Sequence, residues 1–311
     1  MKHKLIEMLR YMRPEGSDTQ LEFCDEFLEP IFGHPDAIGN YIVQVGVKPR
    51  LCFTAHHDTV HKTGGMQSLV VSNDIISVAD PFTSNCLGAD CTTGIWLMLN
   101  MIEAGIHGTY VVHAAEEVGC KGSSGLVYDN PEWLDYTDAV ISFDRKGTDS
   151  VITHQMGIRT ASDEFAKSFA DALNLPQLKS DMHGSYTDSN EYARVVAECT
   201  NISVGYYNQH TVAETQDLEF AEVLLKHLLD ADWTKIVISR DPMTYEDSWG
   251  YYEQSTYEYG KREVSDMVSV VEDNPEGVAR LLESLGYSYQ SLLDECDCDW
   301  FTNSYAARRM M

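Results

Sequence analysis

The chain has 311 residues, of which 22 are basic and 49 acidic, for a formal net charge of −27 at pH 7. A surface of that charge repels nucleic-acid phosphates and anionic membranes, so we expect neither as a partner. No apolar run approaches the roughly 18 residues of a membrane span, and the 43% hydrophobic content is that of a globular protein with a core.

The cysteines and the N-terminus bear on location. The eight cysteines are scattered and lack the spacing of a disulfide framework, which is typical of a reducing compartment. The first 16 residues have an amphipathic helix pattern without the apolar core or cleavage site of a signal peptide. We therefore expect a cytoplasmic protein with free thiols.

Helical and strand patterns alternate along the chain. After the N-terminal helix, residues 17–32 predict a second helix capped by Ser17 or Asp18, and two adjacent strands and a hairpin follow. Residues 91–104 would be apolar on nearly all sides of a helix, which predicts a buried helix. Later apolar runs predict buried strands between helices. The predicted strands are residues 41–47, 50–55, 69–71, 75–79, 109–115, 139–143 and 201–206, and the later helices are residues 91–104, 161–173 and 218–235.

This alternation predicts an α/β fold with a mixed, largely parallel sheet sandwiched between helices. We assign residues 1–240 to this domain. Residues 241–262 are acidic and rich in tyrosine, and we interpret them as a linker. Asn274, Pro275 and Glu276 suit the start of a helix, so residues 263–311 predict a small C-terminal helical appendage.

A candidate metal-binding stretch follows the predicted strand 50–55. Residues 55–61 read A-H-H-D-T-V-H, and open α/β sheets place ligands at the carboxyl ends of strands. In an extended His-x-Asp segment, residues i and i+2 point the same way, so Asp58 can hold the ring of a metal-binding His56. Ordinary surface histidines are the alternative for this stretch alone. We expect His57 and His61 to be surface or substrate-side groups rather than ligands.

Further acidic and imidazole side chains occur where buried elements end or begin: Asp90, Glu116, Glu117, Asp144 and His210. Each alone has a plainer interpretation, as a helix cap or a solvated strand end. Together with the first stretch they suit two divalent cations about 3.5–4 Å apart, with one aspartate bridging them. Zinc, manganese and cobalt all suit such ligands. The glutamate pair supplies one carboxylate more than binding needs, and that carboxylate can transfer protons.

The order of these motifs resembles that of the co-catalytic dizinc exopeptidases, which include aminopeptidases, tripeptidases and glutamate carboxypeptidase-type enzymes. The family pattern is H-x-D, G-x-D, E-E, D and H, and here it falls in that order from His56 to His210. Local words also match, namely H-x-D-T-V, G-A-D-x-x-x-G-I, E-E-V-G and H-T-x-x-E. The resemblance covers about residues 1–240 and implies a phosphorylase/hydrolase-like α/β core.

The resemblance also implies a cofactor and its ligands. The cofactor is a pair of divalent metal ions, with zinc preferred to manganese or cobalt. One ion is bound by a histidine and an aspartate, the other by a glutamate and a histidine, and a second aspartate bridges them. In chain order the ligands are His56, Asp90 (the bridge), Glu117, Asp144 and His210, with His56 and Asp144 sharing one ion.

The implied activity is that of a metallopeptidase that removes a terminal residue from small peptides, most simply an aminopeptidase. A metal-bound hydroxide attacks the amide, Glu116 acts as general base and then as acid, and Asp58 orients His56. A deacylase or carboxypeptidase of the same fold stays open, as does a non-enzymatic metal-binding scaffold that docks a partner. Glu116 argues against the scaffold, because a mere binder does not need the base.

The chain departs from the family pattern in three ways. Cys91 follows the bridging Asp90, where the family often has an acidic or amide residue joined by a cis peptide bond. The spans from His56 to Asp90 and from Asp144 to His210 are too short for the inserted lid or dimerisation domain of many relatives. We therefore expect a bare catalytic domain. The appendage has no counterpart in the pattern, and we consider it a candidate for oligomer formation.

Overall fold

The computed structural model of the chain describes residues 2–243, 278 and 282, and the fold below lies in the compact unit Met1–Tyr252. The predicted appendage and most of the predicted linker lie outside the described residues, so the domain boundaries stay predictions. Within the described part, no helix combines the length and the apolar character that crossing a bilayer requires.

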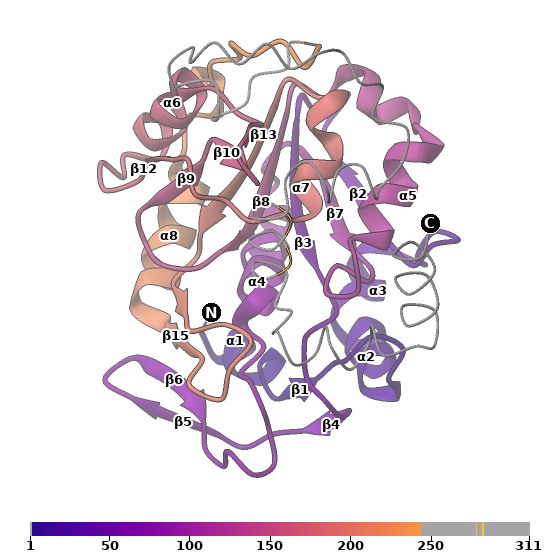
Figure 1. Cartoon of the computed structure of the whole chain (residues 1–311), viewed down its shortest axis with the longest axis vertical. Coiled ribbons are helices and arrows are strands. Elements are labelled where there is room, and N and C mark those ends of the chain that lie inside the picture. The colour runs from indigo at the N-terminus through magenta and orange to yellow at the C-terminus, as the bar shows by residue number, and fades with distance from the viewer. Residues whose placement is uncertain (1, 244–277, 279–281, 283–311) are drawn as a thin grey trace, which may run out of the picture. The chain divides into compact units, whose positions relative to one another are not determined.

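A seven-stranded sheet forms the centre of the domain (Figure 1). In spatial order its strands are β12 (Lys179–Asp181), β9 (Ser150–Ile152), β13 (Glu198–Ser203), β8 (Ala139–Arg145), β3 (Leu51–His56), β7 (Gly108–His113) and β2 (Tyr41–Val45). Strands β13, β8, β3 and β7 run parallel to one another, whereas β2 is antiparallel to β7 and β9 is antiparallel to β13. The predicted α/β fold with a mixed, largely parallel sheet is confirmed.

The prediction that strands 41–47 and 50–55 are neighbours is wrong, because β7 lies between β2 and β3. Val111 of β7 pairs with Ile42 on one side and with Thr54 on the other. All of β7 is buried, as expected of a strand with partners at both edges and helices over both faces. The second strand of the prediction, β3, is also fully buried, but β2 is only partly buried and takes the sheet edge.

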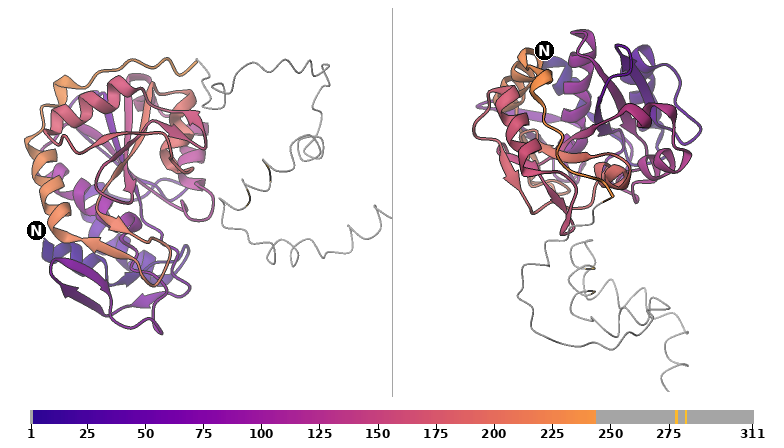
Figure 2. Two further views of the ribbon diagram at one scale, coloured as in Figure 1. Left: turned by 60° about the vertical axis from the view of Figure 1, so that its left-hand side comes forward. Right: turned by 90° about the horizontal axis from the view of Figure 1, so that it is seen from above.

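Helices cover both faces of the sheet (Figure 2). Alternate residues of the central strands serve two separate cores, so Phe53 and Ala55 of β3 face the larger core while Cys52 faces the smaller. The smaller core is closed by α5 (Lys121–Asp129) and the 3-10 helices η2 (Glu132–Tyr136) and η3 (Tyr192–Arg194). The larger is closed by α1 (Lys2–Met8), α2 (Asp18–Phe23), α4 (Ala89–Glu103), α6 (Asp163–Leu173) and α8 (Leu218–Asp230).

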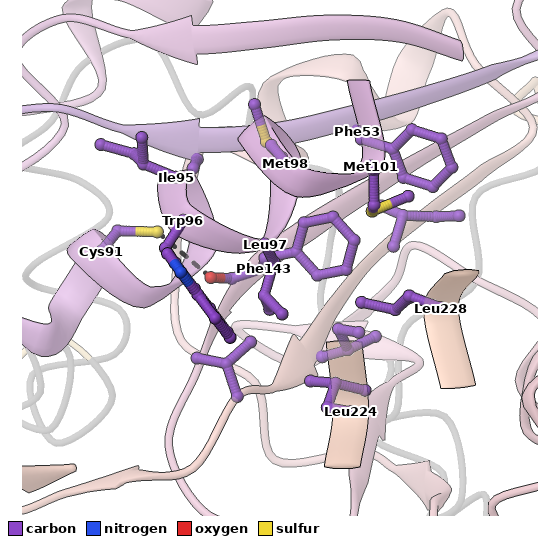
Figure 3. Close-up of a cluster of buried hydrophobic side chains, with 14 of the residues drawn as sticks. Phe53, Cys91, Ile95, Trp96, Leu97, Met98, Met101, Phe143, Leu224 and Leu228 are labelled. Carbon is purple, nitrogen blue, oxygen red and sulfur yellow. Dashed lines mark hydrogen bonds between the residues drawn. The ribbon is translucent and has the colours of Figure 1, made fainter. Parts of the chain in front are cut away.

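Helix α4 is buried on nearly all sides, as its apolar sequence predicts. Figure 3 shows its residues, including Trp96, among Phe53 and Phe143 of the sheet and Leu224 and Leu228 of α8. The helix is therefore fixed between the sheet and α8, and with it the first turn of the helix at the carboxyl edge of the sheet.

The predicted helix 17–32 is continuous but not uniform. The Ser17 hydroxyl accepts a hydrogen bond from the Gln20 N–H at 3.2 Å, so Ser17 is the cap. After α2 the chain widens into a π-helical turn, η1 (Cys24–Leu28), and then continues as α3 (Glu29–Phe32). Pro30 lacks an N–H group, and the preceding Glu29 N–H reaches back to the Cys24 carbonyl.

Three smaller ladders complete the domain. The predicted hairpin is confirmed as β5 (Leu69–Ser72) and β6 (Ile75–Val78), which joins β15 (Thr215–Asp217) and β14 (Tyr206–Tyr207) in a four-stranded antiparallel sheet. Strand β1 (Tyr11–Met12) pairs with β4 (Gly65–Met66), and β10 (His154–Gln155) pairs with β11 (Ile158–Arg159). The short helix α7 (Asp188–Glu191) precedes η3, and η4 (Trp233–Lys235) follows α8, which is shorter than predicted.

Arg13 is fully buried between the end of β3 and the start of α4. Its Nε donates to the His57 carbonyl at 2.9 Å and its Nη2 donates to the Thr92 hydroxyl at 2.7 Å. The guanidinium lies 3.8 Å from the ring centroid of Phe23, and burial lowers the Arg13 pKa to about 10. One cation thus links the segment after β3 to the first turn of α4.

Replacing Arg13 with methionine should lower the free energy of unfolding by about 2–4 kcal/mol, because the His57 carbonyl and the Thr92 hydroxyl lose a buried donor. Urea denaturation followed by fluorescence measures the change. The control is Arg10→Met, which removes an exposed arginine three residues away and should change stability by less than about 0.5 kcal/mol. Equal effects of the two substitutions would contradict the bracing role of Arg13.

Candidate metal centre

The carboxyl ends of the parallel strands meet at one edge of the sheet, and the predicted site residues gather there. His56 is the last residue of β3, Asp144 lies near the end of β8, and the two adjacent glutamates follow β7. Asp90 lies in the first turn of α4, and His210 lies between β14 and β15. The structure brings together all seven side chains that the sequence singles out: His56, Asp58, Asp90, Glu116, Glu117, Asp144 and His210.

The two oxygens of Asp90 face two different histidines. Its Oδ1 lies 3.1 Å from His56 Nε2, and its Oδ2 lies 3.3 Å from His210 Nε2. Beside the first histidine, Asp144 Oδ1 lies 3.7 Å from His56 Nε2. Beside the second, Glu117 Oε1 lies 3.1 Å from His210 Nε2. The arrangement is that of two ligand sets sharing one carboxylate.

The donor atoms of the second set converge without hydrogen-bonding to each other. Glu117 Oε1 is buried and, among the described residues, accepts no hydrogen bond of acceptable geometry, although it lies close to His210. The ligand atoms of Asp90, Glu117 and His210 all lie within 4.8 Å of one another. Short contacts without aligned hydrogen bonds are expected when side chains point to a common centre. These nitrogen and oxygen donors fit zinc, and also manganese or cobalt.

Cys91 lies within the same distance of His56 and Asp144, but it is engaged elsewhere. Its thiol donates to the Phe143 carbonyl at 3.2 Å, which Figure 3 shows as a dashed line. Burial raises the pKa of the Cys91 thiol well above its usual value. The Asp90–Cys91 peptide bond is cis, as in the family pattern.

Burial and neighbouring charges shift the pKa values of several groups in the site. Burial raises the pKa of Asp144 well above 3.8, and the nearby Asp90 carboxylate raises it further. Burial also raises the pKa of Glu116 well above 4.5, and the carboxylates of Asp144 and Asp188 add to this effect. Burial opposes protonation of His210, but Asp90 and Glu117 outweigh it and raise its pKa to about 11. Acids crowded in this way need positive charge beside them, which divalent cations supply.

The comparison with protein families gives the family of the chain. Residues 40–210, a little more than half of the chain, match the model of peptidase family M28. The chain belongs to peptidase family M28. It is therefore a metallopeptidase, and membership implies dependence on metal, zinc in particular. The sequence matches no curated protein.

Solved structures show the same fold at low sequence identity. This M28 peptidase is similar to a tripeptidase from Staphylococcus aureus, with a TM-score of 0.59, 13% identity and coverage of 74% of this chain and 96% of the other. It is also similar to aminopeptidase PepT from Bacillus cereus, with a TM-score of 0.56, 15% identity and coverage of 76% and 97%. A third similar structure is the TET1 peptidase of Pyrococcus horikoshii, which is described as assembling into a tetrahedron or a large octahedral shell. Its TM-score is 0.52 and its sequence identity is 16%, with coverage of 73% of this chain and 99% of the other.

Asp58 of the M28 chain holds the backbone of the glutamate pair. Its Oδ1 accepts from the Glu116 N–H at 3.1 Å and its Oδ2 accepts from the Glu117 N–H at 3.0 Å. The same Oδ1 lies 3.4 Å from His56 Nδ1, which is 3.0 Å from the Asp58 backbone oxygen. Orientation of His56 by Asp58, which the sequence predicts, stays a prediction, and the carboxylate has this second task beside it.

Glu214 is the last residue of the H-T-x-x-E motif, from which no function was predicted for it. In the structure it anchors the loop that carries Asp90. Its side chain is buried, and its two oxygens accept four backbone N–H groups. The donors, at 2.8, 3.0, 2.9 and 3.2 Å, are Leu87, Gly88, Ala89 and Asp90. Glu214 lies four residues after His210, so one carboxylate ties both ligand-bearing segments together. The H-T-x-x-E word was the signal for it.

The prediction that His57 and His61 are surface groups is wrong. Both are buried. His57 lies between Gln20, at 3.0 Å, and the Gly39 carbonyl, at 3.2 Å. His61 lies within hydrogen-bond distance of the Thr59 hydroxyl and a backbone carbonyl. Neutral imidazoles can be buried when both ring nitrogens have hydrogen-bond partners, as they do here. The two rings therefore support the loop after β3 from inside the fold.

We expect the zinc-reloaded chain to bind two ions, and single substitutions to remove them selectively. His56→Ala and His210→Ala should each lose one ion, and Asp90→Asn should lose both, because Asp90 is the one carboxylate in the described part of the chain that faces both histidines. Elemental analysis after gel filtration measures the stoichiometry. His34→Ala, which removes an exposed histidine, is the control. Two ions retained by the Asp90 variant would rule out the bridge.

Glu214→Gln should weaken zinc binding about tenfold or more, since partners that hold ligands in place commonly contribute that much to metal affinity. The amide keeps the size of the side chain but turns an NH2 group toward backbone N–H donors. Competition with a chromophoric chelator measures the affinity. The exposed Glu219 provides the matched control, and Glu219→Gln should bind zinc like the unmodified chain. Unchanged affinity in the Glu214 variant would show that the loop holds its shape without it.

Proposed function

We propose that this M28 peptidase removes the N-terminal residue from small peptides with the help of two zinc ions. The observation that carries the proposal is the pairing of Asp90 with two histidines, with Glu116 as a further carboxylate in the same cleft, 4.0 Å from His56 Nε2. A metal-binding scaffold has no use for that extra buried acid, whereas hydrolysis of an amide needs a group that moves a proton.

The cleft beside the proposed metal centre is lined by members of both proposed ligand sets. Asp90, Glu116, Asp144 and His210 line it together with Tyr186. Its cavity volume is about 80 Å³, so it encloses a small group of a substrate rather than a long peptide segment.

When bound, the two cations supply Lewis acidity that polarises the scissile carbonyl and makes water acidic enough to attack near neutral pH. Glu116 would take the proton from that water and deliver it to the leaving amine. Its side chain is 12% exposed, so it reaches the cleft from a mostly buried position, and its Oε2 lies 4.0 Å from His56 Nε2. The Asp58 carboxylate fixes its backbone, which keeps the base aimed at one place.

A deacylase or carboxypeptidase of the same fold would use the same base and the same ligands. The aminopeptidase and tripeptidase among similar structures support the proposed reaction by fold alone. A panel of free, N-acylated and C-terminally extended peptides separates the three activities by the product released.

Glu116→Gln should lower kcat by about two to four orders of magnitude, because the proposed base is lost while the metal ligands remain. The assay is amino-acid release from unblocked di- and tripeptides, with zinc content measured on the same samples. Dipicolinate should abolish the activity of the unmodified chain, and added zinc should restore it. The exposed Glu103 provides a control, Glu103→Gln, with unchanged kcat. Full activity in the Glu116 variant would overturn this mechanism, and a zinc-loaded chain that hydrolyses no member of the panel would favour a scaffold.

A further inference from the structure

Two basic side chains line the cleft directly beside the proposed metal centre. Arg145 and Lys146 follow the predicted ligand Asp144 in the chain, and both contribute to the cleft wall. Basic residues are scarce here, with 22 against 49 acidic ones in the whole chain. Two of them side by side at a site rich in carboxylates call for a physical explanation.

Arg145 is held by the protein on one side only. Its Nη2 donates to the Asp181 carboxylate at 3.2 Å and to the His183 carbonyl at 3.1 Å. Its Nε is buried and has no hydrogen-bond partner among the described residues. Asp181 and His183 therefore fix the guanidinium, and Arg145 contributes to the wall of the cleft from a held position.

Lys146 carries a charge that the described part of the chain leaves without an ion-pair partner. Its backbone is fixed, because its carbonyl accepts from the Ser203 hydroxyl at 2.7 Å and the next residue, Gly147, donates to the Tyr206 carbonyl at 2.8 Å. The side chain is exposed, so the ammonium group extends from a rigid turn into the cleft. Binding an anion would order this flexible side chain at a cost in entropy, and the fixed backbone limits that cost to the side chain itself.

Three other carboxylates line the same cleft, namely Asp90, Glu116 and Asp144. Asp90 and Asp144 belong to the proposed ligand sets, so the metal ions would match their charge, and Glu116 is the proposed base beside them. Asp181 balances Arg145, which leaves Lys146 as the uncompensated charge facing the substrate. A negative group on the substrate is the natural complement.

We propose that Lys146, with Arg145 beside it in the same cleft wall, binds a carboxylate of the substrate and so makes a free carboxylate a requirement for tight binding. This inference rests on the proposed function in that it assigns a substrate class to the same cleft. The carboxylate has two sources in a peptide, the C-terminus of a short chain or an acidic side chain. Both present the same planar pair of oxygens, which ammonium and guanidinium groups bind well.

The test measures binding separately from turnover. Full-length, zinc-loaded Glu116→Gln protein is titrated by calorimetry with matched pairs of ligands. Leu-Gly and Leu-Gly-Gly, each against its C-terminal amide, report on a terminal carboxylate. Glu-Gly amide against Gln-Gly amide, and Leu-Glu amide against Leu-Gln amide, report on an acidic side chain. We expect the carboxylate member of at least one pair to bind about five- to tenfold more tightly.

Lys146→Met should remove that preference and Lys146→Arg should restore it, because the effect depends on charge rather than on the shape of the fold. Lys146 is the residue of choice, since its side chain makes no ion pair whose loss would disturb the described structure. The control is Lys179→Met, which removes an exposed lysine that does not line the cleft and should leave the preference intact. In the active enzyme, Lys146→Met should raise KM for the preferred peptides with little change in kcat.

The outcomes separate this inference from the proposed function. If every acid binds no better than its neutral partner, or if no ligand binds at all, the carboxylate site does not exist, even in a chain that proves to be an active peptidase. A preference that survives Lys146→Met also overturns it. A preference that depends on Lys146, in a chain that hydrolyses no peptide, would leave the carboxylate site standing and refute the peptidase reaction.

Discussion

Asp90 offers one carboxylate oxygen to each of two histidines that arrive from distant parts of the chain, and the domain is arranged to keep these three groups in register. His56 is fixed by the central sheet, since it ends β3. His210 lies on a connection between two short strands, so the sheet alone does not hold it. Glu214 supplies the missing constraint by gripping the backbone around Asp90 from four residues beyond His210. Arg13 adds a second link, from the segment after β3 to α4.

The same arrangement concentrates negative charge where water is scarce. Asp144 and Glu116 have raised pKa values because burial and neighbouring carboxylates both disfavour their ionised forms. Divalent cations reverse that balance, so binding of metal contributes to the folding free energy of the domain as well as to chemistry. The crowded acids thus lower stability in the absence of metal, and the cations that the family binds would offset that cost.

Much of the fold and of the candidate site could be predicted from the sequence, because both depend on local patterns of apolar and polar residues. Apolar runs marked the buried strands, and the acidic and imidazole side chains that follow them marked one edge of a parallel sheet. What the sequence could not supply depends on contacts across the fold. The insertion of β7 between β2 and β3 is a matter of pairing partners, which local pattern does not specify. Glu214 and Arg13 form hydrogen bonds with backbone groups. Every residue type has a similar backbone, so the residue types do not indicate which backbone groups these side chains bind. His57 and His61 lie in a polar segment that is typical of a surface loop. They are buried because Gln20, Gly39 and Cys86 provide hydrogen-bond partners for their rings from other parts of the chain.

The four-stranded antiparallel sheet connects the centre to the outside of the molecule. Glu214 directly precedes β15, and β15 is hydrogen-bonded to β6 of the hairpin, whose other strand exposes Val70 and Val71. The outer hairpin is therefore connected through β15 to the carboxylate that holds the loop of Asp90. Since Asp90 faces both histidines, both proposed ligand sets share this one connection to the surface of the domain.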